Sequence, residues 1–153
     1  MVGGIRYVAP AEKLSDLNAV HEMAEAHDIA EVRAKLTGWL DGGIIEAKGM
    51  WSRGLRMGAG VALSGLFIRQ FVPVLEWLGA ERMVTTSAKR LLRYAEYTGA
   101  EMLSQDAVPF PDARYETISV VFHVTRSEEI SHPDNAAGIK RDREQLMSSA
   151  IEP

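Results

Sequence analysis

The chain has 153 residues, of which 46% are hydrophobic and 25% are charged, and this balance fits one soluble globular domain with a core of its own. The net charge of -4 is too small to favour a polyanionic partner, so sequence-specific contact with nucleic acid is not expected. The chain contains no cysteine, which excludes disulfides, zinc sites with thiolate ligands and cysteine nucleophiles.

The sequence pattern gives no indication of export or of a membrane segment. The start "MVGGIRYVAP" has neither the basic head nor the long apolar run of a signal peptide. The apolar run "MGAGVALSGLFI" is shorter than the roughly 20 residues that a membrane helix needs. We therefore expect no secretion by signal peptide and no membrane partner.

The first third of the chain predicts a strand and helices that lead into a hairpin. Residues 5–9 form a short strand-like run closed by Pro10. The next apolar residues recur at helical spacing, with Ser15 and Asp16 placed to cap that helix. Residues 29–40 fit a helix or one arm of a hairpin with an Asp-Gly turn, and the pattern favours a short helix that runs into a hairpin.

The middle of the chain predicts a buried helix and then a β-α-β unit. Residues 58–78 are so densely apolar that the helix must be buried on most sides, with Pro73 kinking it and Gly79 ending it. Residues 81–86 and 100–103 predict two strands.

The helix of that unit has clear boundaries in the sequence. It is predicted over residues 87–98, with Ser87 as its cap and Gly99 as its stop. After a loop marked by Pro109 and Pro111, residues 113–126 alternate as a long final strand that we expect to pair antiparallel with a neighbour.

The end of the chain is polar. Residues 127–153 predict one helix, over residues 135–149, and contain little to anchor them in a core. We expect this tail to be held by a second copy of the chain or by another protein, with crystal-type surface contacts as the alternative. The predicted organisation is therefore one domain over residues 1–126 and a tail over residues 127–153.

The stretch "MWSRGLRMGAGVALSG", residues 50–65, has the composition of an anion-binding turn. Glycines let the backbone approach an anion, and a helix N-terminus presents unpaired N–H groups and a positive dipole end. Gly58, Ala59 and Gly60 would supply the turn, while Arg53 and Arg56 would add charge. The alternative is that these glycines serve close packing of the buried helix against the sheet.

The order of elements, with "RGLRMGAGVALSGLFIRQFVPVLEWLGAERMVTTS" and "AKRLLRYAEYTGAEML", resembles the GNAT-type N-acyltransferase family over about residues 4–125. The resemblance implies an α/β (α+β) fold whose mixed, largely antiparallel sheet is flanked by helices. In that family an Arg/Gln-x-x-Gly-x-Gly/Ala turn opens the central helix and binds the pyrophosphate of acetyl-CoA. The next strand splays from its neighbour and admits the pantetheine arm.

The residues themselves and the resemblance each indicate site residues. Glu46, on the strand edge before the turn, is a candidate general base that takes a proton from an amine, because partial burial raises the pKa of a carboxylate; an outward-facing strand residue is the alternative. Tyr94 would protonate the departing CoA thiolate, with packing against the sheet as the alternative, and Ser87 would lie at the cofactor. No metal-ligand spacing is present, so we predict no metal site.

The family motifs are displaced in this sequence. The arginine position of the turn falls on Leu55, and Gly99 is followed by Ala100 where the family has phenylalanine. GNAT-like proteins with eroded motifs occur in bacteriophage particles, and this sequence resembles that type.

The sequence leaves three hypotheses open. The first is a GNAT-like structural or interaction protein of a phage particle that needs no cofactor, found in the cytoplasm or the virion, with copies of itself or other virion proteins as partners. The alternative is an active acetyl-CoA-dependent N-acetyltransferase that acts on an amine. A third hypothesis is a small α+β regulatory protein unrelated to GNATs, which would lack the splay between the central strands.

Overall fold

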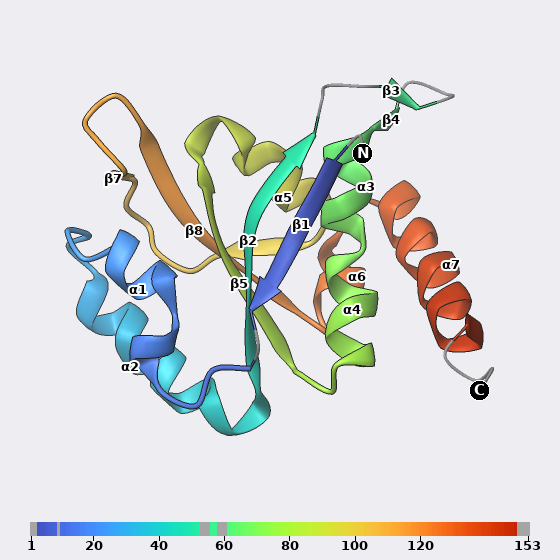
Figure 1. The fold of residues 1–153 in the computed structure, drawn as a ribbon, viewed down its shortest axis with the longest axis horizontal. Coiled ribbons are helices and arrows are strands. Elements are labelled where there is room, and N and C mark those ends of the chain that lie inside the picture. The colour runs from blue at the N-terminus through green and yellow to red at the C-terminus, as the bar shows by residue number, and fades with distance from the viewer. Residues whose placement is uncertain (1–2, 9, 53–55, 58–60, 150–153) are drawn as a thin grey trace.

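A six-stranded sheet forms the centre of the computed structural model, which describes residues 3–8, 10–52, 56–57 and 61–149 (Figure 1). The strand order is β1-β2-β5-β8-β6, with β7 paired to β8. The bounds are β1 (Gly3–Val8), β2 (Ile44–Ser52), β5 (Arg82–Ala88), β6 (Ala100–Met102), β7 (Val108–Pro109) and β8 (Glu116–His123). Strands β2 and β5 run parallel, whereas β1 with β2, and β8 with β5, β6 and β7, are antiparallel. The predicted mixed, largely antiparallel sheet is confirmed.

Helices cover both faces of this sheet (Figure 1). One face carries η1 (Leu14–Asp16), α1 (Asn18–Glu22), α2 (Ile29–Trp39) and η2 (Leu40–Gly42). The other face carries α3 (Leu63–Arg69), α4 (Phe71–Trp77), η3 (Lys89–Leu91) and α5 (Leu92–Tyr97), with α6 (Ser127–Ile130) and α7 (Pro133–Ser149) outside them. A small two-stranded sheet of β3 (Arg56–Met57) and β4 (Val61–Ala62) precedes α3.

The two helical layers explain the apolar runs in the strands. Successive side chains of a strand point to opposite faces, so Ile44 packs with α1 and α2 while Ile45 packs with α4. Residues 117–122 of β8 are all buried, as expected for a strand covered on both sides. The core therefore has two parts, one on each face of the sheet.

The two central parallel strands separate along their length. Their ladder has the pairs Ile44 with Arg82, Ile45 with Met83 and Glu46 with Val84. Both strands continue, β2 along β1 and β5 along β8, with no further pair between them in the described ladder. The predicted splay is present, which argues against the hypothesis of an unrelated α+β fold.

The predicted hairpin after residue 29 is wrong. Residues 29–39 form the continuous helix α2, in which Val32 and Leu36 are buried at helical spacing. The Asp-Gly pair lies in the 3-10 turn η2, and Gly43, with φ +78°, leads the chain directly into β2. The antiparallel partner of β2 is therefore the distant strand β1.

The predicted central helix is two helices, and the break lies one turn before Pro73. Helix α3 ends at Arg69 and α4 begins at Phe71. A proline has no N–H for the carbonyl four residues earlier, here that of Arg69, and its ring clashes with that carbonyl. Pro73 is tolerated in the first turn of α4, so the chain breaks at Gln70 and not at the proline. Residues 58–60 of the predicted helix lie outside the described residues.

Two boundaries near β5 also differ from the prediction. Ser87 pairs with Ile118 inside the β5–β8 ladder, so it does not cap a helix, and α5 begins at Leu92. Gly99 does end α5: its φ is +87°, and an added Cβ would lie 1.9 Å from the carbonyl oxygen of Ser127. The final strand is shorter than predicted and spans Glu116–His123.

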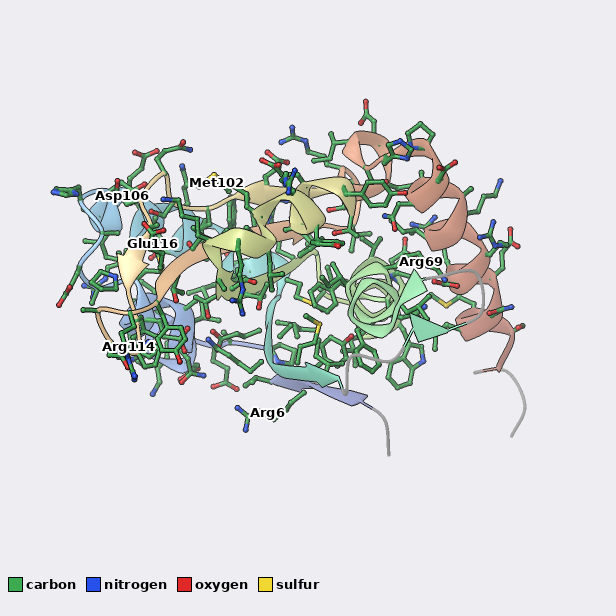
Figure 2. All side chains as sticks on the ribbon, turned by 90° about the horizontal axis from the view of Figure 1, so that it is seen from above. Arg6, Arg69, Met102, Asp106, Arg114 and Glu116 are labelled. Atoms are coloured by element: carbon green, nitrogen blue, oxygen red, sulfur yellow. The ribbon has the colours of Figure 1, made fainter. Side chains whose placement is uncertain are left out.

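The C-terminal segment is anchored within the chain, contrary to the prediction of a tail with little to hold it in a core. Its predicted helix is present as α7, which packs beside α3 and α4 (Figure 1). Ile139 is fully buried, and Asp142 accepts a hydrogen bond from Arg69 Nε at 2.6 Å; Figure 2 shows Arg69 between α3 and α7. Arg143 contacts both Glu76 of α4 and Glu128 of α6. A partner is therefore not needed to hold residues 127–149.

Candidate functional site

The gap between β2 and β5 opens into a cavity of about 280 Å³. It lies on the face covered by α3, α4 and α5 and has two zones with different chemistry. We call the buried zone the inner end; it consists of Ala47, Phe71, Ala95, Val120 and Phe122. We call the zone nearer solvent the rim; it includes residues 48–50 of β2 and residues 85–88 of β5.

The inner end is apolar and its walls are braced. Phe71 and Phe122 pack edge to face with ring centroids 5.0 Å apart, and Tyr7 packs edge-on to Phe71 at 6.1 Å. Burial raises the pKa of Tyr7 to about 12, so the phenol stays neutral at physiological pH. These stacked rings fix the shape of the inner end.

The rim offers strand edges without ladder partners. Beyond Glu46 and Val84, the facing edges of β2 and β5 are not paired with each other, although backbone N–H and C=O groups ordinarily require partners. At the start of the gap the Thr85 hydroxyl donates to the carbonyl of Ala47 at 2.8 Å. An extended ligand with amide groups can pair with such edges.

A polar network crosses the gap on the side of α1. Lys48 Nζ donates to Glu22 Oε2 at 2.6 Å and to Thr86 Oγ1 at 2.8 Å. The Thr86 hydroxyl in turn donates to Glu22. The side chains of Lys48 and Glu22 are 12% and 16% exposed. Because Lys48 and Thr86 also line the cavity, the network connects the cavity with a carboxylate on α1.

Glu46, the predicted general base, lies on the α1 face and does not line the cavity. It is almost fully buried, not outward-facing. Its carboxylate accepts the backbone N–H groups of Asn18 at 2.9 Å and Ala19 at 2.7 Å, and Lys48 Nζ is 3.5 Å away. These bonds satisfy the free N–H groups at the start of α1, so the placement favours a structural role.

The other predicted site residues lie in different places. Ser87 lines the rim. Tyr94 is 56% exposed on α5 and does not line the cavity.

The predicted anion-binding turn falls largely outside the described residues. This holds for Arg53, Gly58, Ala59 and Gly60, whereas Arg56 is described by its backbone alone, in β3. Because β2 and β5 are parallel, their carboxyl ends lie at the same edge of the sheet. The segment that follows β2 therefore starts at the wide end of the gap.

The residues of the polar network, Lys48, Glu22 and Thr86, are not among the site residues predicted from the sequence. Lys48 and Glu46 are two positions apart and so share a face of β2, an acid–base pattern within an otherwise apolar strand. That pattern could have identified Lys48. Nothing local could have identified Glu22 or Thr86, which are 26 and 38 positions away from Lys48.

The described residues contain neither a cluster of metal-ligating side chains nor a helix that could span a membrane. Across residues 3–8, 10–52, 56–57 and 61–149, no group of three or more His, Asp or Glu could hold a metal ion. Within the same residues, every helix is too short or too polar to cross a bilayer.

Comparison with known proteins supports the fold class. No family model and no curated protein matches the sequence. The structure of FeeM, an N-acyl amino acid synthase from uncultured soil microbes, aligns with a TM-score of 0.61 at 10% identity. The alignment covers 85% of this chain and 65% of FeeM, so this chain spans about two-thirds of that protein's length. At this identity the likeness shows the fold, and the GNAT-like fold class is confirmed.

Two acyl-homoserine lactone synthases described as CoA-dependent align more loosely. MesI has a TM-score of 0.49 at 17% identity, over 94% of this chain and 63% of MesI. BjaI, solved with SAM and isopentyl-CoA, has a TM-score of 0.44 at 15% identity, over 92% of this chain and 58% of BjaI.

Proposed function

We propose that this chain transfers an acyl group from acyl-CoA to an amine, with the pantetheine arm of the donor in the gap between β2 and β5. The observation that carries the proposal is the parallel ladder that stops at Glu46 and Val84 and leaves a cavity beside two unpaired strand edges. FeeM, which shares the fold, is described as an N-acyl amino acid synthase. That description supports the acyltransferase hypothesis over the phage-particle hypothesis.

The anchoring of α7 also weakens the case for a particle component. That hypothesis relied partly on a tail with nothing to hold it, whereas Ile139 and Asp142 attach α7 to the domain. A role in a phage particle, and an assembly of several copies, stay predictions.

The gap suits the pantetheine arm because the arm is extended and contains two amides. Residues 48–50 and 86–88 border the gap as unpaired strand edges, which can exchange hydrogen bonds with such amides as an added strand would. The thioester would then lie near the point where the strands diverge. The predicted pyrophosphate turn, with Gly58 and Gly60, lies outside the described residues and stays a prediction.

The polar network offers a route for the proton that the amine must lose. The amine nitrogen attacks the thioester carbonyl carbon, the C–S bond breaks and CoA leaves as a thiolate that water protonates. The proton from the amine passes through the Thr86 hydroxyl to Glu22, which that hydroxyl contacts. Glu22 therefore takes the role predicted for Glu46, and Lys48 holds its carboxylate in place.

The decisive experiment is a titration of the full chain with CoA and acyl-CoA. At a hundredfold excess over the dissociation constant, a ligand stabilises the folded state by about 2.7 kcal/mol, which a thermal melt detects. The substitution Ala88→Phe places a ring at the rim of the gap and should weaken binding at least tenfold. Ala137→Phe, at an exposed alanine of α7, is the matched control. The proposal is wrong if millimolar CoA and acyl-CoA leave the melting temperature unchanged.

A further inference from the structure

The rim and the inner end of the cavity differ in polarity as well as in exposure to solvent. Every polar side chain that lines the cavity belongs to the rim, and the hydroxyl of Thr85 and the groups of Lys48 and Thr86 already have partners. The inner end presents alanine, valine and phenylalanine side chains that are at most 6% exposed. A group that enters the inner end therefore gains apolar contact and no hydrogen bond.

The inner end stays open because of small residues and braced rings. Ala47 on β2 and Ala95 on α5 contribute a single methyl group each to its walls. Phe71 and Phe122 brace each other at 5.0 Å, and α4, which carries Phe71, is held from outside by the ion pair of Glu76 with Arg143. The rings are therefore not free to collapse into the space.

The size of the cavity exceeds the requirement of an acetyl group. Protein interiors are packed with few voids larger than a water molecule, whereas this cavity has a volume of about 280 Å³. At ~30 Å³ each, the whole cavity, rim included, has room for roughly nine groups of the size of water. An acetyl group would occupy about two such volumes, so an acetyl donor whose pantetheine arm lies along the rim would leave part of the apolar inner end without contacts.

We propose that the inner end binds an unbranched aliphatic acyl chain longer than acetyl, with about eight carbons as its upper limit, so that the preferred donor is a medium-chain acyl thioester and not acetyl-CoA. This inference rests on the proposed function, since it assumes that the thioester lies at the rim. The chain would run from the rim between Ala47 and Ala95 toward the stacked rings of Phe71 and Phe122.

Calorimetric titration with a series of donors tests the inference. The probes are CoA, acetyl-CoA, butanoyl-CoA, hexanoyl-CoA, octanoyl-CoA and dodecanoyl-CoA. Affinity should rise by about fourfold for each buried methylene and stop rising at about eight carbons or before. Octanoyl-CoA has six methylenes more than acetyl-CoA, so it should bind roughly 60-fold more tightly if three of them are buried and roughly 4,000-fold more tightly if all six are.

Filling the inner end provides the matched variants. Ala95→Leu from the helix side and Ala47→Val from the strand side each add methyl groups to a wall of the inner end. Both should lower the affinity for octanoyl-CoA at least tenfold and leave acetyl-CoA within about twofold, which also shows that the variants are folded. Ala137→Leu, at an exposed position of α7, should change neither affinity.

The outcomes separate this inference from the proposed function. Equal affinities for acetyl-CoA and octanoyl-CoA, or inner-end variants that do not discriminate between them, would overturn the acyl-chain site while acyl transfer stands. Failure of CoA and of every acyl-CoA to bind would overturn both. A medium-chain optimum that Ala95→Leu or Ala47→Val shortens supports the site.

Discussion

At the scale of single residues, two glutamates near α1 have different environments. Glu46 is 1% exposed and bonded to the N–H groups of Asn18 and Ala19. Glu22 lies at the end of the network that reaches the cavity through Thr86 and Lys48. Because Glu46 is buried and its hydrogen bonds are satisfied, it is suited to a structural role. Because Glu22 contacts a hydroxyl that lines the cavity, it is suited to proton transfer.

Substitution of these glutamates should have separable effects. Glu22→Gln should lower kcat for acyl transfer by about 100-fold with an unchanged KM for acyl-CoA, measured by release of the CoA thiol. Glu25→Gln, an exposed position just after α1, is the control. Glu46→Ala should lower the free energy of unfolding by roughly 3 kcal/mol, because it leaves buried N–H groups and Lys48 without a partner. A full loss of kcat in a stable Glu46→Gln variant would instead restore Glu46 as the base.

Asp28 makes the free energy of unfolding depend on pH. Partial burial raises the pKa of Asp28, but hydrogen bonds from the Ser104 hydroxyl and the Gln105 N–H outweigh burial and hold the pKa below its ordinary value. Because the folded-state pKa is lower than the unfolded one, this stabilisation is complete above the unfolded-state pKa and is lost as pH falls through the folded-state pKa.

The substitution Asp28→Asn isolates this effect. It should lower the free energy of unfolding at pH 7 by about 1 kcal/mol, and the difference from the natural chain should shrink as pH falls below about 4. Urea unfolding at pH 7 and pH 3 measures both values. A difference that grows toward low pH would contradict the assignment.

At the scale of elements, the break between α3 and α4 and the position of α7 belong together. Gln70 at the break and Arg69 before it both donate to Asp142 of α7, each at 2.6 Å. Pro73 sets where the helix breaks, and the carboxylate of α7 binds the two residues at that break. Because Ile68 and Phe71 flank them and line the cavity, α7 supports one wall of the site.

Removal of that carboxylate should therefore detach α7. Asp142→Ala should lower the free energy of unfolding by about 2 kcal/mol, since it leaves a partly buried arginine and amide unpaired. Hydrogen exchange of residues 133–149 should become faster than in the rest of the chain. Glu144→Ala, at an exposed position of the same helix, should leave both measurements unchanged.

The elements show which parts of the fold local sequence can predict. The strands β1 and β5 and the helices α2 and α7 are close to their predicted ranges, because side-chain periodicity is a local signal. The prediction of a hairpin was wrong because residues 36–40 fit both the helical and the strand periodicity. Leu36 is buried in the core, and this burial favours the helix. The prediction of Ser87 as a helix cap was wrong because Ser87 pairs with Ile118 and β5 continues to Ala88.

At the scale of the whole molecule, the sheet consists of two parts joined by a short parallel ladder. One part is β1 with β2, and the other is β5 with β8, β6 and β7. Three pairs, the last of Glu46 with Val84, connect them. A donor bound in the gap would act as an added strand between the two parts.

Such a ligand should protect both strand edges from hydrogen exchange. With saturating acyl-CoA, amides in residues 48–50 and 86–88 should exchange at least tenfold more slowly, whereas amides of α2, on the other face of the sheet, should keep their rates. Exchange resolved by mass spectrometry on the full chain measures both. Protection confined to another surface would contradict binding in the gap.

The sequence by itself determined several of the helices and strands and the glycine that ends α5, because these depend on side-chain spacing and backbone conformation within a few residues. Only the tertiary structure decided where the site lies. The length of the β2–β5 ladder, the contact of Lys48 with Glu22 and Thr86, and the apolar inner end at Phe71 and Phe122 join segments far apart in the chain. The arrangement of these segments depends on which strands pair and on where the pairing of β2 with β5 stops. Packing of the whole chain determines the choice of strand partners and the length of that ladder.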